Sequence, residues 1–104
     1  MKVIITNHGG KRARERIGIN RRAVRRMANK VFVNGYSPQE FGGPFRRYLD
    51  GVYGRNESHT EIRIYGEHIW IFGYENALIT VLVVPHKYRS KVRSKKRRTN
   101  ELVH

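Results

Sequence analysis

Apolar and polar residues alternate through residues 61–65 and 68–72, where isoleucine occupies every second position. This two-residue period is typical of β-strands, and glycine-containing tight turns separate the runs. The run from Ala77 to Val84 is apolar apart from Thr80, which predicts a central strand covered on both faces. Together the three runs predict an antiparallel β-meander around which the chain is organised.

Two basic helices are predicted before this meander. The first spans about residues 10–17, and either Thr6 or Asn7 can cap its N-terminus. Gly18 can end it in the left-handed conformation, and Asn20 can cap the second helix. The second helix has one apolar stripe at helical spacing, formed by Val24, Met27, Ala28 and Val31.

A third helix is predicted from Pro44, because proline suits the first position of a helix. Its apolar stripe is formed by Phe45, Tyr48, Leu49 and Val52. Residues 3–5 are either a short strand at the sheet edge or an apolar lead-in. The predicted fold is α+β, with two to three N-terminal helices packed on one face of a small antiparallel meander. We expect a single domain over residues 1–86 and an exposed basic tail over residues 87–104.

The charge of the chain narrows its function. Its 104 residues include 22 lysines and arginines against 8 aspartates and glutamates, a formal net charge of +14. Such an excess in one small domain favours a polyanionic partner, and nucleic acid is the simplest one. A membrane surface or an acidic protein is the alternative. Hydrophobic residues make up 38% of the chain, which is too many for a fully disordered protein.

The chain contains no cysteine, which excludes disulfides, thiolate zinc sites and a cysteine nucleophile. This composition fits a reducing compartment, and we expect a cytoplasmic protein. No apolar run approaches the roughly 20 residues of a membrane span, so no membrane insertion is expected. The sequence has no glycine-rich phosphate loop, no nucleophile elbow and no recognised metal-ligand spacing, so we expect neither a cofactor nor a metal.

His8, Arg12 and Arg16 are four residues apart, a spacing that places all three along one face of a helix. A neutral imidazole can accept a proton, and guanidinium groups can hold a phosphate. This combination suits metal-independent RNA cleavage, in which a base removes the 2′-hydroxyl proton and arginine stabilises the charge that develops on the phosphate. The alternative is an arginine face that grips phosphate without catalysis.

Two segments carry a resemblance to a known superfamily. They are His8–Ile19, with the form His-x3-Arg-x3-Arg followed by Ile-Gly-Ile, and the strand segment Leu78-Ile79-Thr80-Val81. They resemble the barnase, EndoU, colicin and RelE-like superfamily of small ribonucleases, above all the short RelE-like proteins of phages and mobile elements. The resemblance implies two N-terminal helices on an antiparallel sheet and metal-free RNA cleavage.

The same resemblance implies the catalytic residues His8, Arg12, Arg16 and Thr80. The histidine would act as general base or acid, the arginines would clamp the phosphate, and the threonine would donate a hydrogen bond. Further residues are expected to bind the nucleic-acid backbone. They are Arg14, Arg21, Arg22, Arg25, Arg26, Arg46, Arg47, Lys95, Lys96, Arg97 and Arg98.

Two functions stay open at this point. The first is a metal-independent endoribonuclease of phage or toxin type, for which an acidic inhibitor protein is an expected partner. The second is a non-catalytic phage or mobile-element protein that binds nucleic acid or inhibits host machinery. In the second case the helix pair over residues 10–33 would act like a helix-turn-helix, with the arginines of the second helix facing a duplex.

Overall fold

The computed structural model describes residues 3–54 and 60–95. Within these residues the α-helices are α1 (Asn7–Ile17), α2 (Arg21–Asn34), α3 (Gly43–Gly54) and α4 (Arg89–Arg93). The strands are β1 (Ile4–Ile5), β2 (Glu61–Tyr65), β3 (His68–Phe72) and β4 (Ala77–Val83). Short 3-10 helices lie at η1 (Pro38–Glu40), η2 (Tyr74–Asn76) and η3 (His86–Tyr88). The protein is therefore α+β, as predicted.

The strands form one sheet in the order β1-β4-β3-β2. β2, β3 and β4 are the predicted antiparallel meander. β1 pairs in parallel with β4, with Ile4 opposite Ala77 and Ile5 opposite Leu78, so the sheet is mixed and not purely antiparallel. Two apolar residues give no signal of strand direction. The parallel pairing is possible because most of the chain separates β1 from β4 and can serve as the crossover.

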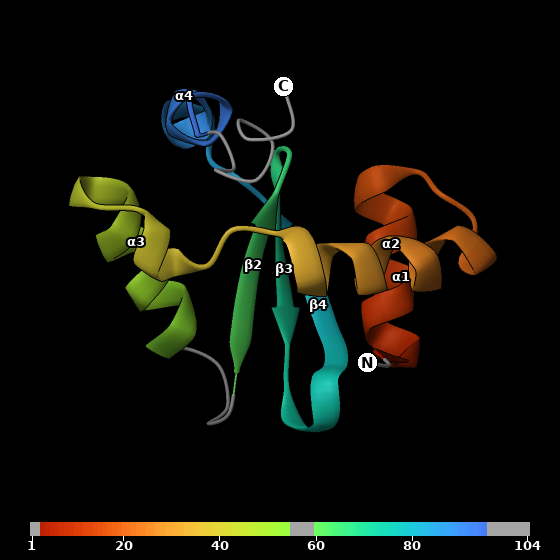
Figure 1. The fold of residues 1–104 in the computed structure, drawn as a ribbon. Coiled ribbons are helices and arrows are strands. Elements are labelled where there is room, and N and C mark those ends of the chain that lie inside the picture. The colour runs from red at the N-terminus through yellow and green to blue at the C-terminus, as the bar shows by residue number, and fades with distance from the viewer. Residues whose placement is uncertain (1–2, 55–59, 96–104) are drawn as a thin grey trace, which may run out of the picture.

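Helices cover both faces of the sheet, with α1 and α2 on one side and α3 on the other (Figure 1). Trp70 and Phe72 of β3 belong to a buried cluster with residues of α1 and α2. Ile69 and Ile71 of the same strand belong to a second cluster with residues of α3 and α4. The prediction that the helices share one face is therefore wrong. β3 is apolar at successive positions, so water must be excluded from both of its faces.

α1 begins three residues earlier than predicted, at Asn7. The Thr6 hydroxyl accepts a hydrogen bond from the Gly9 amide (2.9 Å) and donates one to the Leu78 carbonyl (2.6 Å). This cap starts the helix and also ties it to β4. A side chain at position 9 would overlap the Leu78 carbonyl, so the close approach requires glycine. His8 consequently lies inside the first turn of α1.

α2 follows α1 after three residues. Gly18 ends α1 in the left-handed conformation, with φ of 78°. The Asn20 side chain accepts a hydrogen bond from the Ala23 amide (2.8 Å) and starts α2. Both capping predictions are confirmed. The predicted apolar stripe of α2 faces the sheet: three of its residues are buried and the methionine is partly buried, namely Val24, Ala28, Val31 and Met27.

α3 closes the opposite face. It begins at Gly43, one residue before the predicted start. Phe45, Leu49 and Val52 of its predicted stripe are buried, and Tyr48 packs partly buried against them. The Phe45 ring lies 4.9 Å from the Phe41 ring, centroid to centroid. The helical spacing of this stripe was therefore readable from the sequence, but the face it covers was not.

The folded part of the chain extends beyond residue 86, where the exposed tail was predicted to begin. Tyr88 stacks on Phe45 with ring centroids 5.1 Å apart, and Val92 of α4 is buried. Glu67 in the β2–β3 turn pairs with Arg89 at 3.2 Å and with Arg93 at 3.8 Å. These contacts hold α4 against the sheet. The remainder of the predicted tail, residues 96–104, lies outside the described residues.

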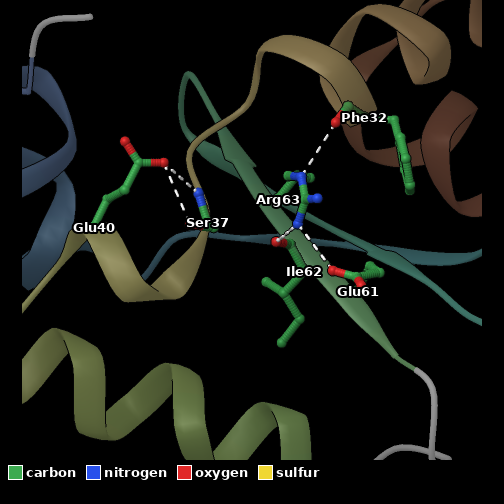
Figure 2. A network of polar contacts seen from close by, with 6 residues as sticks. All are labelled: Phe32, Ser37, Glu40, Glu61, Ile62 and Arg63. Carbon is green, nitrogen blue, oxygen red and sulfur yellow. Dashed lines mark hydrogen bonds and ion pairs between the residues drawn. The ribbon is translucent and has the colours of Figure 1, made fainter.

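Arg63 closes the free edge of β2 (Figure 2). Its Nε donates to the Phe32 carbonyl near the end of α2 (3.2 Å), and its Nη1 donates to the Ile62 carbonyl (3.0 Å). The same nitrogen pairs with Glu61 at 3.2 Å. The backbone of Tyr36 pairs with that of the next residue of the strand, Ile64, through two hydrogen bonds of 2.8 Å. Arg63 therefore has a structural role at a sheet edge that would otherwise expose unpaired backbone groups.

Candidate nucleic-acid interface

α1 and α2 concentrate positive charge on one side of the protein. Residues 7–34 contain nine basic side chains and one acidic side chain. The acidic residue, Glu15, pairs with Arg12 at 3.0 Å. Three acidic residues elsewhere pair with arginines close to them, namely Asp50, Glu61 and Glu67. None of these three reduces the positive charge on α1 and α2 by direct pairing.

A cleft of about 820 Å³ lies between α1, β1 and the first turns of α2. Ile5 and Val24 contribute apolar surface to it, and Thr6, Asn7 and Asn20 contribute neutral polar groups. Its basic lining residues are Lys11, Arg14, Arg21, Arg22 and Arg25, and no acidic residue lines it. We call this the basic cleft.

Helix geometry explains how the sequence builds the basic cleft. Lys11 and Arg14 are three residues apart on α1, and Arg21 and Arg25 are four residues apart on α2, so each pair shares one helix face. The three-residue connection at Gly18 turns the chain so that the first turns of α2 lie beside α1. Basic residues from two separate stretches of the sequence therefore line one cleft.

The charges of the basic cleft are not compensated within the described residues. None of its five basic side chains forms a hydrogen bond or ion pair with another described residue. Arg21 and Arg22 occupy the first turn of α2, which contains no acidic residue. The helix macrodipole disfavours positive charge at this end of a helix. An anionic ligand with several negative groups would relieve both this conflict and the mutual repulsion of the five cations.

The structure brings together four of the predicted nucleic-acid-binding residues, Arg14, Arg21, Arg22 and Arg25, in the basic cleft. Arg26 is exposed on α2 but does not line the cleft. Lys11 lines the cleft and was missed. Its spacing of three from Arg14 within the predicted first helix was the available signal.

Other predicted contacts lie apart from the cleft, on and beyond α3. Arg46 pairs with Asp50 at 3.0 Å, and Arg47 is exposed. The Lys95 ammonium lies 5.2 Å from the centre of the Phe41 ring, a cation–π geometry that helps to fix the end of α4. The remaining predicted residues, Lys96, Arg97 and Arg98, lie outside the described residues.

The predicted catalytic residues of α1 form one row, as their spacing required. His8 is exposed in the first turn of the helix, and Arg12 is paired with Glu15. Arg16 donates its Nε hydrogen to the Val81 carbonyl at 3.2 Å. α1 runs along β4 from Leu78, at the Thr6 cap, to this carbonyl. The row therefore belongs to a helix that runs alongside β4, the strand predicted to complete the site.

Thr80 lies beside this row but faces another direction. It pairs with Ile71 in the sheet register, and Ile71 belongs to the cluster on the α3 face. Paired residues project from the same face of a sheet, so Thr80 is directed toward the α3 face. Arg16 reaches β4 one residue from Thr80. In the described part of the chain, no hydrogen bond joins Thr80 to His8, Arg12 or Arg16.

In residues 3–54 and 60–95, no group of three or more histidine and acidic side chains could hold a metal ion. No helix there is both long enough and apolar enough to cross a membrane.

Comparison of the chain with known proteins found no matching protein family, no matching curated protein and no matching solved structure. The resemblance to small ribonucleases accordingly rests on the short motifs of α1 and β4 alone.

Proposed function

We propose that this protein binds nucleic acid and that the basic cleft is its principal phosphate-binding surface. The observation that carries the proposal is a cleft lined by five basic residues and no acidic residue, in which none of the five has a hydrogen-bond or ion-pair partner among residues 3–54 and 60–95. Arginine forks and lysine ammonium groups are the side chains that neutralise backbone phosphates. A single small anion would leave most of these charges uncompensated, whereas a phosphodiester chain presents one charge per nucleotide.

The proposal is tested by fluorescence anisotropy with labelled RNA and DNA strands and duplexes at several salt concentrations. We expect binding at low salt that weakens steeply as salt rises, because bound phosphates release condensed counterions. Arg14→Ala combined with Arg25→Ala should weaken binding to every probe. Lys87→Ala combined with Lys91→Ala removes the same charge from exposed positions outside the cleft and serves as the matched control. Absence of binding to all probes at low salt would contradict the proposal.

A second candidate function is metal-independent endoribonuclease activity, and the row on α1 favours it. An exposed imidazole at His8 could remove the proton of a 2′-hydroxyl, which would then attack the adjacent phosphorus. Arg12 and Arg16 could stabilise the negative charge of that step, since the Val81 bond uses only Nε of Arg16. The bond from phosphorus to the 5′-oxygen would break, this oxygen would take a proton from water, and the product would carry a 2′,3′-cyclic phosphate.

This second candidate is tested by incubating labelled single-stranded RNA with the protein in EDTA. We expect an active enzyme to produce cyclic-phosphate ends and to lose cleavage on His8→Ala and on Arg16→Ala. His86→Ala alters another exposed histidine, in η3, and should leave cleavage unchanged. If the protein binds the RNA tightly but the RNA stays intact, the ribonuclease function is contradicted and the binding function is not. An acidic inhibitor, if the protein acts as a cytoplasmic toxin, would be expected to compete for the basic cleft.

A further inference from the structure

The connection between α1 and α2 has the form of a helix-turn-helix. Three residues separate the helices, Gly18 adopts the left-handed conformation, and Asn20 caps the second helix. Both helices and their connection contribute to one apolar cluster. Its members from this region include Ala13, Ile17, Ile19, Val24 and Met27. α2 runs across α1 at the near side of the molecule (Figure 1), which is the arrangement of two helices joined by a short glycine-containing turn.

The face of α2 that points away from the sheet carries an exposed apolar residue among its arginines. Arg26 and Val33 follow Arg22 by four and by eleven residues, so the three lie along one face of a helix with 3.6 residues per turn. All three are exposed, and Val33 is 68% exposed. Val24 and Val31 are buried on the face toward the sheet. We call the exposed row the α2 crest. It combines two arginines with an apolar side chain that is largely exposed.

From this geometry we infer that the protein binds double-stranded DNA, with α2 lying in the major groove and the basic cleft holding the adjacent phosphate backbone. The inference rests on the proposed nucleic-acid binding and names its ligand. The major groove of B-form DNA is about 12 Å wide and admits an α-helix. The deep and narrow major groove of A-form RNA does not. The crest would enter the groove and the flanking cleft would grip phosphate, the two tasks that duplex recognition requires, and Arg22, which belongs to both surfaces, lies where they meet.

The chemistry of the α2 crest indicates which bases it would contact. An arginine fork can bond to both acceptors of guanine in the major groove, and an apolar side chain can contact the methyl group of thymine. Arg22 and Arg26 would supply the forks, and Val33 would supply the apolar contact. Asn29, an amide that could otherwise contact adenine, accepts a hydrogen bond from the Val3 amide (3.0 Å) and donates one to the Arg25 carbonyl (3.0 Å). Its structural bonds leave guanine contacts as the main source of discrimination.

The test compares binding of the full chain to duplex DNA and to duplex RNA of the same sequence, each of about 20 base pairs or roughly two helical turns. We expect DNA to bind at least about tenfold more tightly, since only its major groove accepts the helix. Arg22→Ala combined with Arg26→Ala should abolish this preference. Lys87→Ala combined with Lys91→Ala loses the same charge from exposed positions outside the cleft and should keep it. Circular dichroism of each variant establishes that the fold is retained.

A second pair of substitutions separates charge from groove recognition. Arg22→Lys combined with Arg26→Lys keeps the charge but removes both forks. We expect this variant to bind random duplex DNA nearly as well as the wild type, and to lose the guanine-containing preference obtained by selection from a randomised duplex pool. Equal or tighter binding to duplex RNA overturns the assignment, as does a DNA preference that survives Arg22→Ala with Arg26→Ala. A protein that binds no probe would remove the proposed function as well, whereas equal binding to DNA and RNA overturns only the duplex-DNA assignment.

Discussion

Removal of three positive charges from the basic cleft should change the salt dependence of DNA binding by a calculable amount. The informative variant combines Arg14→Ala, Arg21→Ala and Arg25→Ala. These side chains come from both helices, line the cleft and form no hydrogen bond or ion pair with another described residue. Their removal should therefore act on the bound phosphates with little direct effect on the fold.

The magnitude follows from counterion release. Each phosphate neutralised on B-form DNA contributes about −0.9 to the slope of log K against log salt concentration. If each of the three arginines meets one phosphate, the variant should reduce the magnitude of the slope by about 2.7. If the variant and the wild type bind equally at about 1 M salt, this difference in slope corresponds to a loss of affinity on the order of a hundredfold at physiological salt. The slope is the more specific quantity, because loss of shape complementarity alone would weaken binding without changing it.

Fluorescence anisotropy titrations between about 50 and about 200 mM salt provide both slopes. The control variant combines Lys87→Ala, Lys91→Ala and Arg93→Ala, which removes three exposed charges from η3 and α4. We expect its slope to match that of the wild type. The reasoning is refuted if the cleft variant keeps the wild-type slope, or if the control variant loses as much of the slope as the cleft variant does.

Three stability predictions test the fold that positions the cleft, each by thermal or urea unfolding. Gly9→Ala should destabilise the protein by about 2 kcal/mol or more, because the added carbon would overlap the Leu78 carbonyl. The control is Gly42→Ala, where the added carbon meets no atom, and it should be neutral or slightly stabilising. Equal effects of the two substitutions would contradict the α1–β4 packing. Thr6→Val should cost about 1–2 kcal/mol, since it removes the hydroxyl that caps α1 and bonds to β4; an unchanged midpoint would exclude this cap. Phe45→Ala should cost about 3–5 kcal/mol, as its ring is buried at the centre of the α3 cluster, and a loss below about 1 kcal/mol would place that ring outside the core.

Local chemistry made much of the fold predictable. Gly18 tolerates the left-handed conformation and Asn20 offers a side-chain oxygen to nearby amides. Both effects act within a single turn, so the end of α1 and the start of α2 followed from the sequence. The isoleucines of β2 and β3 and the stripes of α2 and α3 show the periods of their elements. None of these signals depends on distant parts of the chain.

Contacts between distant residues were not predictable. The bond from Thr6 to Leu78 spans 72 positions, and it decides both where α1 begins and that His8 lies within the helix. The direction of β1 and the face covered by α3 depend on similar pairings. Tyr88 and Val92 are isolated apolar residues in a basic stretch, so their packing against Phe45 and its neighbours left no periodic pattern to detect.

The candidate site shows the same division. Arg21, Arg22 and Arg25 were recognisable as a basic helix face because they are close in sequence. Their meeting with Lys11 and Arg14 depends on the turn between the helices, which sets the relative position of α1 and α2. Thr80 was linked to the α1 row by motif alone, and the sheet register directs it to the α3 face.

An NMR titration would show directly whether nucleic acid binds in the basic cleft. Isotope-labelled protein is titrated with a short DNA duplex while the backbone amide and arginine Nε signals are followed. We expect the largest shifts in residues 10–14 and 20–26, with smaller changes in α3 and α4. Shifts concentrated on α3 and α4, or no shifts at low salt, would contradict binding in the basic cleft.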